Sequence, residues 1–203
     1  ASPVISLNPP DDIRISTVGV PVPGVDLIFD DDGQILVRGD MVMQGYWGAA
    51  DATADAIQDG WLQTGDIGEM DADGYLKITG RKKEIIVNSG GDNIAPARVE
   101  ALLSIHPDIE QAMLTGDKRP WLAAVIVPSA EMRGLPKAEQ QKHLKAACDD
   151  INANLSPLEK IRRFIIADEP FSIENGEMTP TLKVRRHVVI KRYAKTLDAL
   201  YKS

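Results

Sequence analysis

The chain has 203 residues, of which 43% are hydrophobic and 26% are charged, and its net charge is −7. These values are ordinary for a globular protein, and the length allows one large domain or two small ones. The acidity speaks against a protein that binds nucleic acid through its bulk charge. The one cysteine, Cys148, rules out an intrachain disulfide and fits a reducing compartment. No apolar run is long enough for a membrane span.

The first ten residues read as the middle of a loop. They include no initiator methionine, no charged segment and no apolar segment of the kind that signal peptides have. We therefore expect the chain to be a fragment of a longer protein.

Residues 1–80 are expected to form mostly antiparallel β-structure. Turn signals separate short β-branched runs, and the Asp-Asp-Asp-Gly sequence at residues 30–33 indicates a turn rather than a metal site. Asp51 is expected to cap a short helix, and residues 59–66 are dense in turn residues. The expected elements are strands over residues 25–29, 34–38, 67–70 and 75–79 and a helix over residues 51–57.

After residue 83 strands and helices alternate. Cys148 lies on the apolar stripe of a helix expected over residues 137–155, so it is interpreted as a core residue and not a nucleophile. The predicted fold class is α+β, with an antiparallel β-rich subdomain followed by a small mixed α+β domain. The other expected elements are strands over residues 84–88, 109–115, 121–128 and 161–167, a helix from Pro96, and a final helix over residues 184–201.

Residues 78–96 separate the two halves. A strand runs into Gly80, a basic triplet follows at residues 81–83, and a second strand leads to a Ser-Gly-Gly loop at residues 89–91. A basic segment between two different architectures predicts an interdomain hinge. The alternative is a surface turn with three solvated cations.

Three places have side chains suited to nucleotide chemistry. Asp66 follows a glycine turn, where a carboxylate can accept hydrogen bonds from a vicinal diol such as ribose. Arg81 can grip a phosphate or a ribose with two donors. Lys183 ends a Pro-Thr turn at the start of a helix, from which it could enter a site on a neighbouring domain and stabilise negative charge that develops on a phosphate or a carboxylate. The alternatives are a turn residue, a solvated surface run and a helix-start cation without a role.

Metal and phosphate-loop signatures are missing from the sequence. The three histidines, His106, His143 and His187, have no partner at ligand spacing, so a metal site is not expected. Neither a GxGxxG nor a GxxxxGK[ST] pattern occurs. A nucleotide site would therefore lack its phosphate loop in this chain.

Five segments in a fixed order make a more specific pattern than any one of them. They are residues 39–47, 59–68, 74–87 and 89–96 and the Thr-Pro-Thr-Leu-Lys sequence at residues 179–183. The pattern resembles the C-terminal part of adenylate-forming enzymes, the superfamily of acyl-CoA synthetases, luciferases and peptide-synthetase adenylation domains. Within it, the basic hinge and the Thr-Pro-Thr-Leu-Lys motif are most similar to bacterial long-chain fatty-acid CoA ligases.

The resemblance implies an AMP-forming acid–thiol ligase that works in two steps. A fatty acid carboxylate attacks the α-phosphate of Mg²⁺-bound ATP, which gives an acyl-adenylate and pyrophosphate. The thiol of CoA then attacks the acyl carbon and releases AMP. Between the steps the C-terminal domain rotates about the hinge.

The resemblance also implies roles for single residues. Asp66 matches the carboxylate that holds the ribose hydroxyls, and Arg81 matches a nucleotide-contacting arginine. Lys83 matches the hinge residue, and Lys183 matches the lysine that contacts the carboxylate and the α-phosphate during adenylation.

The Ser89, Gly90 and Gly91 loop resembles the segment that enters the site for thioester formation and leaves room for the pantetheine arm. Gly80 departs from the aspartate common at this place in relatives, which leaves the role of position 80 open.

The implied domain organisation is the barrel-like β subdomain of a large N-terminal domain over residues 1–80, a hinge at residues 81–83 and a mobile domain over residues 84–203. The phosphate loop, the magnesium ligand and the fatty-acid pocket then belong to a missing N-terminal part, so the chain alone is expected to be inactive. Partners are fatty acid, ATP, CoA and that missing part. The expected location is the cytoplasm, with peripheral contact to the inner membrane left open.

Two alternatives remain open at this stage. The adenylation enzyme could activate another acid or pass the acyl group to a carrier protein, since the same C-terminal residues would serve. The chain could also be a stand-alone, non-catalytic module that binds a nucleotide or a partner.

Overall fold

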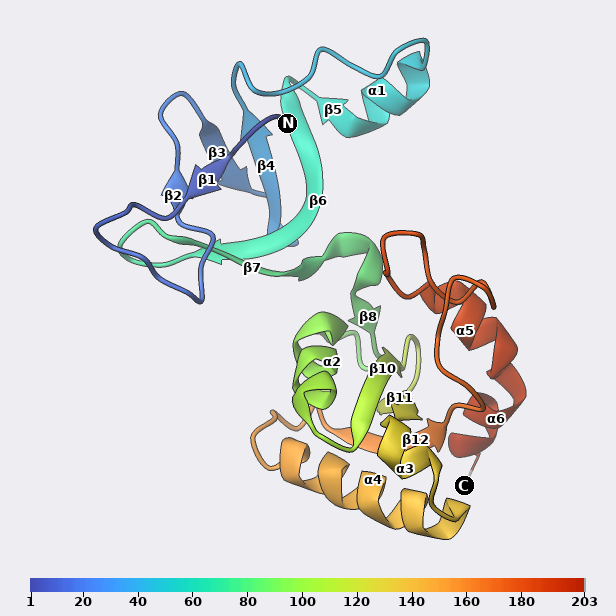
Figure 1. The fold of residues 1–203 in the computed structure, drawn as a ribbon. Coiled ribbons are helices and arrows are strands. Elements are labelled where there is room, and N and C mark those ends of the chain that lie inside the picture. The colour runs from blue at the N-terminus through green and yellow to red at the C-terminus, as the bar shows by residue number, and fades with distance from the viewer. Residues whose placement is uncertain (203) are drawn as a thin grey trace. The chain divides into compact units, whose positions relative to one another are not determined.

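The computed structural model describes residues 1–202, which form two compact units that divide after Glu84 (Figure 1). We call them unit 1, from Ala1 to Glu84, and unit 2, from Ile85 onward. Each contains its own hydrophobic core, so each is described by itself.

Unit 1 is built on a five-stranded antiparallel sheet around its longest strand, β6. Four buried side chains, Ile35, Val37, Leu62 and Leu76, form the centre of the core. β6 pairs with β4, β5 and β7, and β4 pairs with β3, whereas β1 and β2 form a separate pair. The elements are β1 (Ser6–Leu7), β2 (Val20–Pro21), β3 (Asp26–Phe29), β4 (Gln34–Arg38), α1 (Ala50–Ala56), β5 (Ile57–Gln58), β6 (Trp61–Met70) and β7 (Leu76–Arg81).

Two local predictions in unit 1 were wrong. Residues 59–66 are not mainly a turn, because β6 begins at Trp61 and places Leu62 in the core. Asp51 does not cap α1, because it lies within the first turn of the helix. The N-cap residue is Ala49, and no side chain caps the helix. The Thr53 hydroxyl accepts a hydrogen bond from the Tyr46 N–H and donates one to the Ala49 carbonyl, at 2.9 Å in each case.

The acidic triplet forms a turn, as predicted. Asp30 Oδ1 accepts hydrogen bonds from the backbone N–H groups of Asp32 at 2.9 Å and Gln34 at 2.8 Å. Such side-chain to backbone bonds are the reason that aspartate favours turns. Within residues 1–202, no group of three or more His, Cys, Asp or Glu side chains is arranged to hold a metal ion.

Unit 2 is a three-layer sandwich with a three-stranded sheet in the middle. β10 and β11 are antiparallel and β11 and β12 are parallel. Helices α2 and α4 cover one face, and α5 and α6 cover the other (Figure 1). The elements are β8 (Ile86–Val87), β9 (Asn93–Ile94), α2 (Pro96–Ile105), β10 (Ile109–Thr115), β11 (Leu122–Pro128), α3 (Ala130–Arg133), α4 (Lys137–Asn152), β12 (Ile161–Ile166), α5 (Arg186–Arg192) and α6 (Ala194–Leu200).

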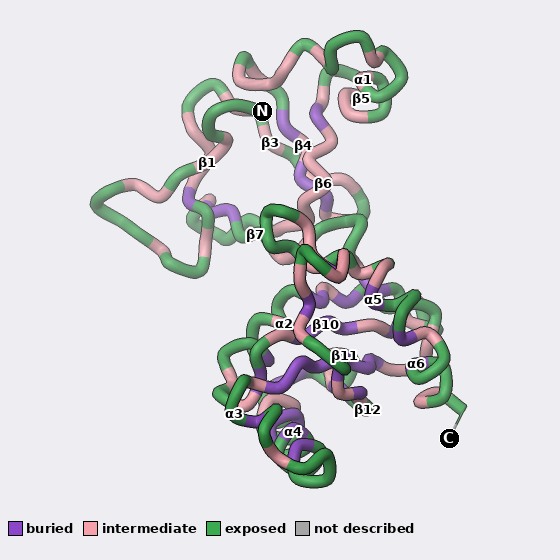
Figure 2. Tube along the Cα trace, turned by 45° about the vertical axis from the view of Figure 1, so that its right-hand side comes forward, coloured by how far each residue is buried: buried purple, intermediate pink, exposed green. Residues whose placement is uncertain are grey.

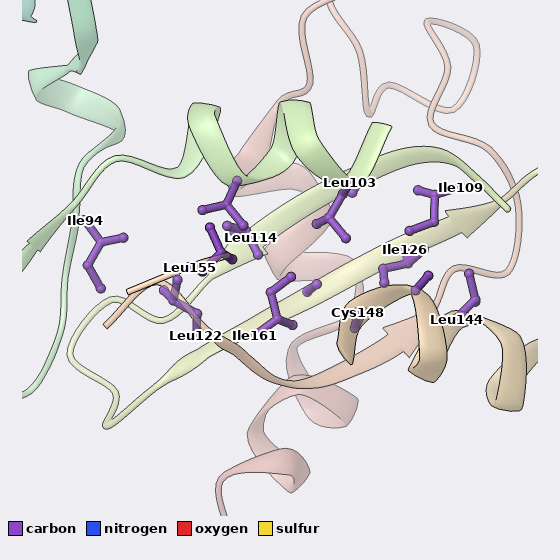
Figure 3. Close-up of a cluster of buried hydrophobic side chains, with 14 of the residues drawn as sticks. Ile94, Leu103, Ile109, Leu114, Leu122, Ile126, Leu144, Cys148, Leu155 and Ile161 are labelled. Carbon is purple, nitrogen blue, oxygen red and sulfur yellow. The ribbon is translucent and has the colours of Figure 1, made fainter. Parts of the chain in front are cut away.

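The period-two alternation of strand residues explains the two cores of unit 2. Leu122, Ala124 and Ile126 of β11 point to the α2 and α4 side, and Val125 and Val127 point to the α5 and α6 side. Because both faces are covered, all seven residues of β11 are buried, as the tube in Figure 2 shows. Figure 3 shows the first of these cores, with side chains of the sheet meeting those of α2 and α4.

Cys148 lies in this core, on α4, and is 3% exposed (Figure 3). Burial raises the pKa of its thiol to about 12, from the value of about 8.5 usual for a free thiol. In the folded chain the thiol therefore stays protonated at pH 8. Because the unfolded chain loses this proton first, the thiol's contribution to stability is full below about pH 8.5 and declines as the pH rises above it.

We therefore expect Cys148 to react with a thiol reagent at pH 8 at least about a hundredfold more slowly in the folded chain than in the denatured chain. The measurement is the rate of labelling with an aromatic disulfide, with and without denaturant. Equal rates would show that Cys148 is accessible and reactive.

Two elements predicted from residue 84 onward have other bounds in the structure. Residues 84–88 do not form one strand, since a short 3₁₀ helix at Lys82–Glu84 precedes the two-residue β8. The final helix is two helices that meet at Tyr193, whose hydroxyl accepts a hydrogen bond from the Asp168 N–H at 3.0 Å. It also starts later than expected, because Val184 is engaged in an antiparallel bridge with Met178.

None of the helices within residues 1–202 has the length and apolar character needed to cross a membrane.

Candidate functional site

The first candidate segment, residues 64–66, forms a bulge in β6. The register of β6 against β4 moves from Leu36 opposite Gln63 to Gln34 opposite Ile67, so three residues of β6 face one of β4. Gly65 has a φ of 75°, a conformation that favours glycine. The Thr64 hydroxyl donates to the Ile35 carbonyl at 2.7 Å and accepts from the Asp66 N–H at 3.1 Å. A bulge of this kind turns the following side chain to a new direction.

Asp66 and Arg81 are brought together by the pairing of β6 and β7. They are opposite each other in the register, and Arg81 Nε lies 2.8 Å from Asp66 Oδ1. The two strands approach closely just beyond this pair, where a Cβ on Gly68 would lie 2.6 Å from the Lys77 carbonyl oxygen. The Asp66 side chain is 24% exposed, so a partly desolvated carboxylate stands beside a solvent-accessible guanidinium.

Two cavities open on this region of unit 1. Asp66 and Thr64 line one of about 280 Å³ together with apolar side chains such as Ile35 and Ile78. Arg81, Lys83, Thr64 and Gly65 line a larger one of about 560 Å³, whose wall includes Gln34, Gln63, Tyr46 and Asp55. The larger cavity combines two cations with neutral hydrogen-bonding groups and the one carboxylate of Asp55, and its two cations are the groups that a phosphorylated ligand would bind.

The basic triplet is not a run of three solvated cations. Arg81 is paired with Asp66, and Lys82 Nζ lies 2.8 Å from Asp32 and 3.1 Å from Asp30. Hydrogen bonds to these two carboxylates raise the pKa of Lys82. Lys83 is exposed, sits in the 3₁₀ helix and lines the larger cavity.

The Ser-Gly-Gly loop of unit 2 is a tight turn between β8 and β9 that Asn88 holds in shape. Asn88 Oδ1 accepts hydrogen bonds from the N–H groups of Gly90 at 2.8 Å and Asp92 at 2.9 Å. Gly91 has a φ of 87° and no atom near the position of an added Cβ. The Ser89 N–H donates to the Arg119 carbonyl at 2.9 Å, which ties this loop to the one that joins β10 and β11.

Lys183 stands at the end of a second tight loop, residues 178–184. The Thr179 N–H donates to the Lys183 carbonyl at 2.8 Å, and the Lys183 N–H donates to the Thr179 hydroxyl at 3.1 Å. Leu182 takes a left-handed φ of 59°, so the loop turns sharply immediately before Lys183. Lys183 is exposed, and α5 starts three residues later, so the lysine lies on a loop rather than at a helix start.

The structure also contains a site that the sequence did not indicate. A cavity of about 510 Å³ in unit 2 is lined by Pro120, Trp121, Arg162 and Arg163. The Trp121 Nε1–H is buried and has no hydrogen-bond partner among residues 1–202. The loop at residues 116–120 links this cavity to the Ser-Gly-Gly loop. The adjacent arginines of β12 were the available signal, but only the fold places them beside Trp121.

The fold of unit 2 and its exposed lysine loop agree with the C-terminal domain of an adenylate-forming enzyme, which the sequence motifs resemble. Residues 83–203 match the AMP-binding enzyme C-terminal domain family, and the chain belongs to this family.

Curated relatives match almost the whole chain. The chain is 42% identical to the long-chain-fatty-acid–CoA ligase FadD15 of Mycobacterium tuberculosis, over 97% of this chain and 36% of that protein. It is 37% identical to the putative fatty-acid–CoA ligase fadD11 of the same species, over 98% of this chain and 38% of that protein. The chain thus spans little more than a third of the length of these relatives.

Solved structures have the same fold. The adenylation domain of a carboxylate reductase from Mycobacterium chelonae matches 93% of this chain and 32% of its own with a TM-score of 0.79, at 24% identity. The adenylation domain of a carboxylic acid reductase from Segniliparus rugosus, solved with AMP and a co-purified carboxylic acid, matches 91% of this chain and 32% of its own, with a TM-score of 0.74 and 28% identity.

Proposed function

We propose that this chain is part of a long-chain fatty-acid CoA ligase that forms acyl-CoA, AMP and pyrophosphate through an acyl-adenylate. The observation that carries the proposal is the Asp66–Arg81 pair: Asp66 follows a β-bulge and lines the smaller cavity of unit 1, and Arg81 lines the larger cavity together with Lys83. The substrate class rests on the similarity to FadD15 over 97% of the chain.

In the first step a carboxylate oxygen of the fatty acid attacks the α-phosphorus of ATP, and pyrophosphate leaves. Asp66 accepts hydrogen bonds from the ribose hydroxyls, and Arg81 donates to the ribose or a phosphate. Lys183 stabilises the negative charge that builds up on the α-phosphate and the attacking carboxylate. Mg²⁺ would bind the phosphates of ATP, and we assign its protein ligand to a part of the ligase outside this chain.

In the second step the thiol sulfur of CoA attacks the acyl carbon, and AMP leaves. Lys83 is the proposed hinge about which unit 2 rotates between the steps. The small residues Ser89, Gly90 and Gly91 then leave room for the pantetheine arm. The chain alone holds only a part of this machinery, so we expect it to be inactive.

The cavity at Trp121 is the proposed site for the phosphorylated nucleotide of CoA. Arg162 and Arg163 supply two guanidinium groups, which bind phosphates well, and Trp121 supplies an aromatic ring. The hydrogen bond between Ser89 and Arg119 connects this cavity to the loop assigned to pantetheine. A molecule as long as CoA could therefore engage both places in unit 2.

Changing Arg162 and Arg163 together to alanine in the full-length protein should raise the KM for CoA about tenfold or more, since a charge-assisted hydrogen bond contributes about 1.5–3 kcal/mol. The rate of adenylation should stay unchanged. Steady-state kinetics with CoA and with dephospho-CoA measure the effect, and Lys145→Ala on the exposed face of α4 is the control. An unchanged KM for CoA would contradict this site.

The reaction itself is tested with the full-length protein by two assays: fatty-acid-dependent exchange of pyrophosphate into ATP and formation of acyl-CoA. We expect both activities with long-chain acids and neither with the 203-residue chain alone. Exchange with an aryl acid only, or acyl transfer only to a carrier protein, would favour the alternative adenylation enzymes. Absence of exchange with any acid would favour a non-catalytic module.

A further inference from the structure

The loop that carries Lys183 has to be held firmly against the rest of unit 2 if the lysine is to reach a defined position. The hydrogen bonds that the structure shows for residues 179–183 are all within the loop and give it its shape, whereas Met178 and Val184 at its two ends pack against the core of unit 2. The helix that follows, α5, has only seven residues and so contributes little stability of its own. What fixes α5 therefore also fixes Lys183.

The first residue of α5, Arg186, is bound to the free edge of the sheet. Arg186 Nη1 donates to the Leu114 carbonyl at 2.9 Å, and Arg186 Nη2 is paired with Glu100 Oε2. Glu100 Oε1 in turn accepts from the Leu114 N–H at 2.6 Å. β10 is an edge strand, so the ion pair satisfies the two backbone groups of Leu114 that a further strand would otherwise bind.

This ion pair differs from the surface pairs of unit 2 in its burial. The Glu100 side chain is 16% exposed and that of Arg186 is 22%, whereas both partners of the Lys145–Asp149 pair are at least 60% exposed. A partly buried pair with additional hydrogen bonds defines a geometry, and removal of one partner leaves the other charge without compensation. The pair connects three elements, α2, β10 and α5.

The C-terminal end of α5 contacts the residue that precedes the same loop. Arg192 Nη1 lies 3.2 Å from Oε1 of Glu177, a fully buried carboxylate immediately before the loop. The Glu177 carbonyl accepts from the Arg185 N–H at 2.7 Å, which closes the base of the loop. The loop, its base and α5 thus form one connected piece, which the Arg186–Glu100 pair anchors to the edge of the sheet.

We propose that Glu100 and Arg186 are positioning residues for Lys183. Neither needs to touch the substrates, because they act by fixing the start of α5 and, through it, the lysine loop. The proposal rests on the function proposed above, in which Lys183 serves adenylation and not thioester formation.

The kinetic test compares the two half-reactions of the full-length protein. Glu100→Gln should lower the kcat of adenylation about 10- to 100-fold, as expected when a catalytic group is displaced by about 1 Å. The KM for ATP and thioester formation from a supplied acyl-adenylate should stay close to those of the unchanged protein. Arg186→Gln should have the same effect, and the double variant should add little, because both residues act through one pair.

Arg98→Gln is the matched control, because it removes another arginine–carboxylate pair at α2, with Glu159. Arg186→Lys keeps the charge but loses the bidentate guanidinium, so its rate of adenylation should lie between those of Arg186→Gln and the unchanged protein. If Glu100→Gln and Arg98→Gln have the same effect, or if both half-reactions fall equally, the positioning role is wrong.

The physical test is independent of activity and uses the 203-residue chain. Glu100→Gln should increase amide hydrogen exchange over residues 178–186 about tenfold, while exchange in α4 stays unchanged as the internal reference. Unchanged exchange in the loop would overturn the proposal even if activity fell. A full-length protein without adenylation activity would overturn the proposed function, and hydrogen exchange would still decide whether the pair holds the loop.

Discussion

Replacing Lys183 with alanine in the full-length protein is expected to lower the rate of adenylation by at least about a hundredfold, since removal of one preorganised electrostatic group typically costs this much. Thioester formation from a supplied acyl-adenylate should be nearly unchanged. The reason is that the α-phosphate has to be stabilised only while the acyl–phosphate bond forms. Exchange of pyrophosphate measures the first step, and release of AMP from the acyl-adenylate in the presence of CoA measures the second.

The position of Lys183 allows its side chain to be removed without loss of the hydrogen bonds that shape the loop. Its side chain is exposed, and the hydrogen bonds that it makes within the loop are made by its backbone, which alanine keeps. Lys191→Ala, an exposed lysine of α5, is the control for loss of a cation nearby. An equal loss of both half-reactions in Lys183→Ala would contradict the assigned role.

The second large effect is expected for Asp66. Asp66→Ala in the full-length protein should raise the KM for ATP about 10- to 100-fold, because the ribose loses its carboxylate acceptor and a hydrogen bond to a charged group contributes about 1.5–3 kcal/mol. Arg81 also loses the carboxylate that orients it, at 2.8 Å. The measurement is steady-state kinetics at varied ATP concentration.

Unit 1 offers a matched control for this substitution. Asp26 and Arg38 are likewise opposite each other on paired strands and form an ion pair at 2.7 Å, but they line neither cavity. Asp26→Ala should therefore leave the KM for ATP unchanged. If the two variants behave alike, Asp66 does not bind the nucleotide.

Calorimetry with the 203-residue chain distinguishes a ligase fragment from a stand-alone nucleotide-binding module. If neither the chain nor its Asp66→Ala variant binds ATP with magnesium, the nucleotide site needs a further part of the ligase. Binding that is lost on Asp66→Ala would support a stand-alone module with a working half-site.

Much of the architecture could be predicted because it depends on local patterns. Apolar and β-branched runs between turn signals predicted β4, β10 and β12 almost to the residue, and the helical stripe placed Cys148 in the core. The same patterns failed where a tertiary contact overrides local preference. Tyr193 divides the final helix, and β6 continues through residues that read as a turn.

The sequence by itself determined the class of each half, the family, and the candidates Asp66, Arg81 and Lys183, because these depend on residue types at short spacing. Only the tertiary structure decided which side chains meet. Asp66 meets Arg81 because β6 and β7 pair in a register that sets them opposite each other, and Glu100 meets Arg186 because the outer side of the edge strand β10 leaves the backbone groups of Leu114 without a strand partner. Arg162 and Arg163 line a cavity with Trp121 because β11 and β12 are neighbours in the sheet. Strand register and sheet order bring together residues that are distant in the chain, and neither can be predicted from local periodicity.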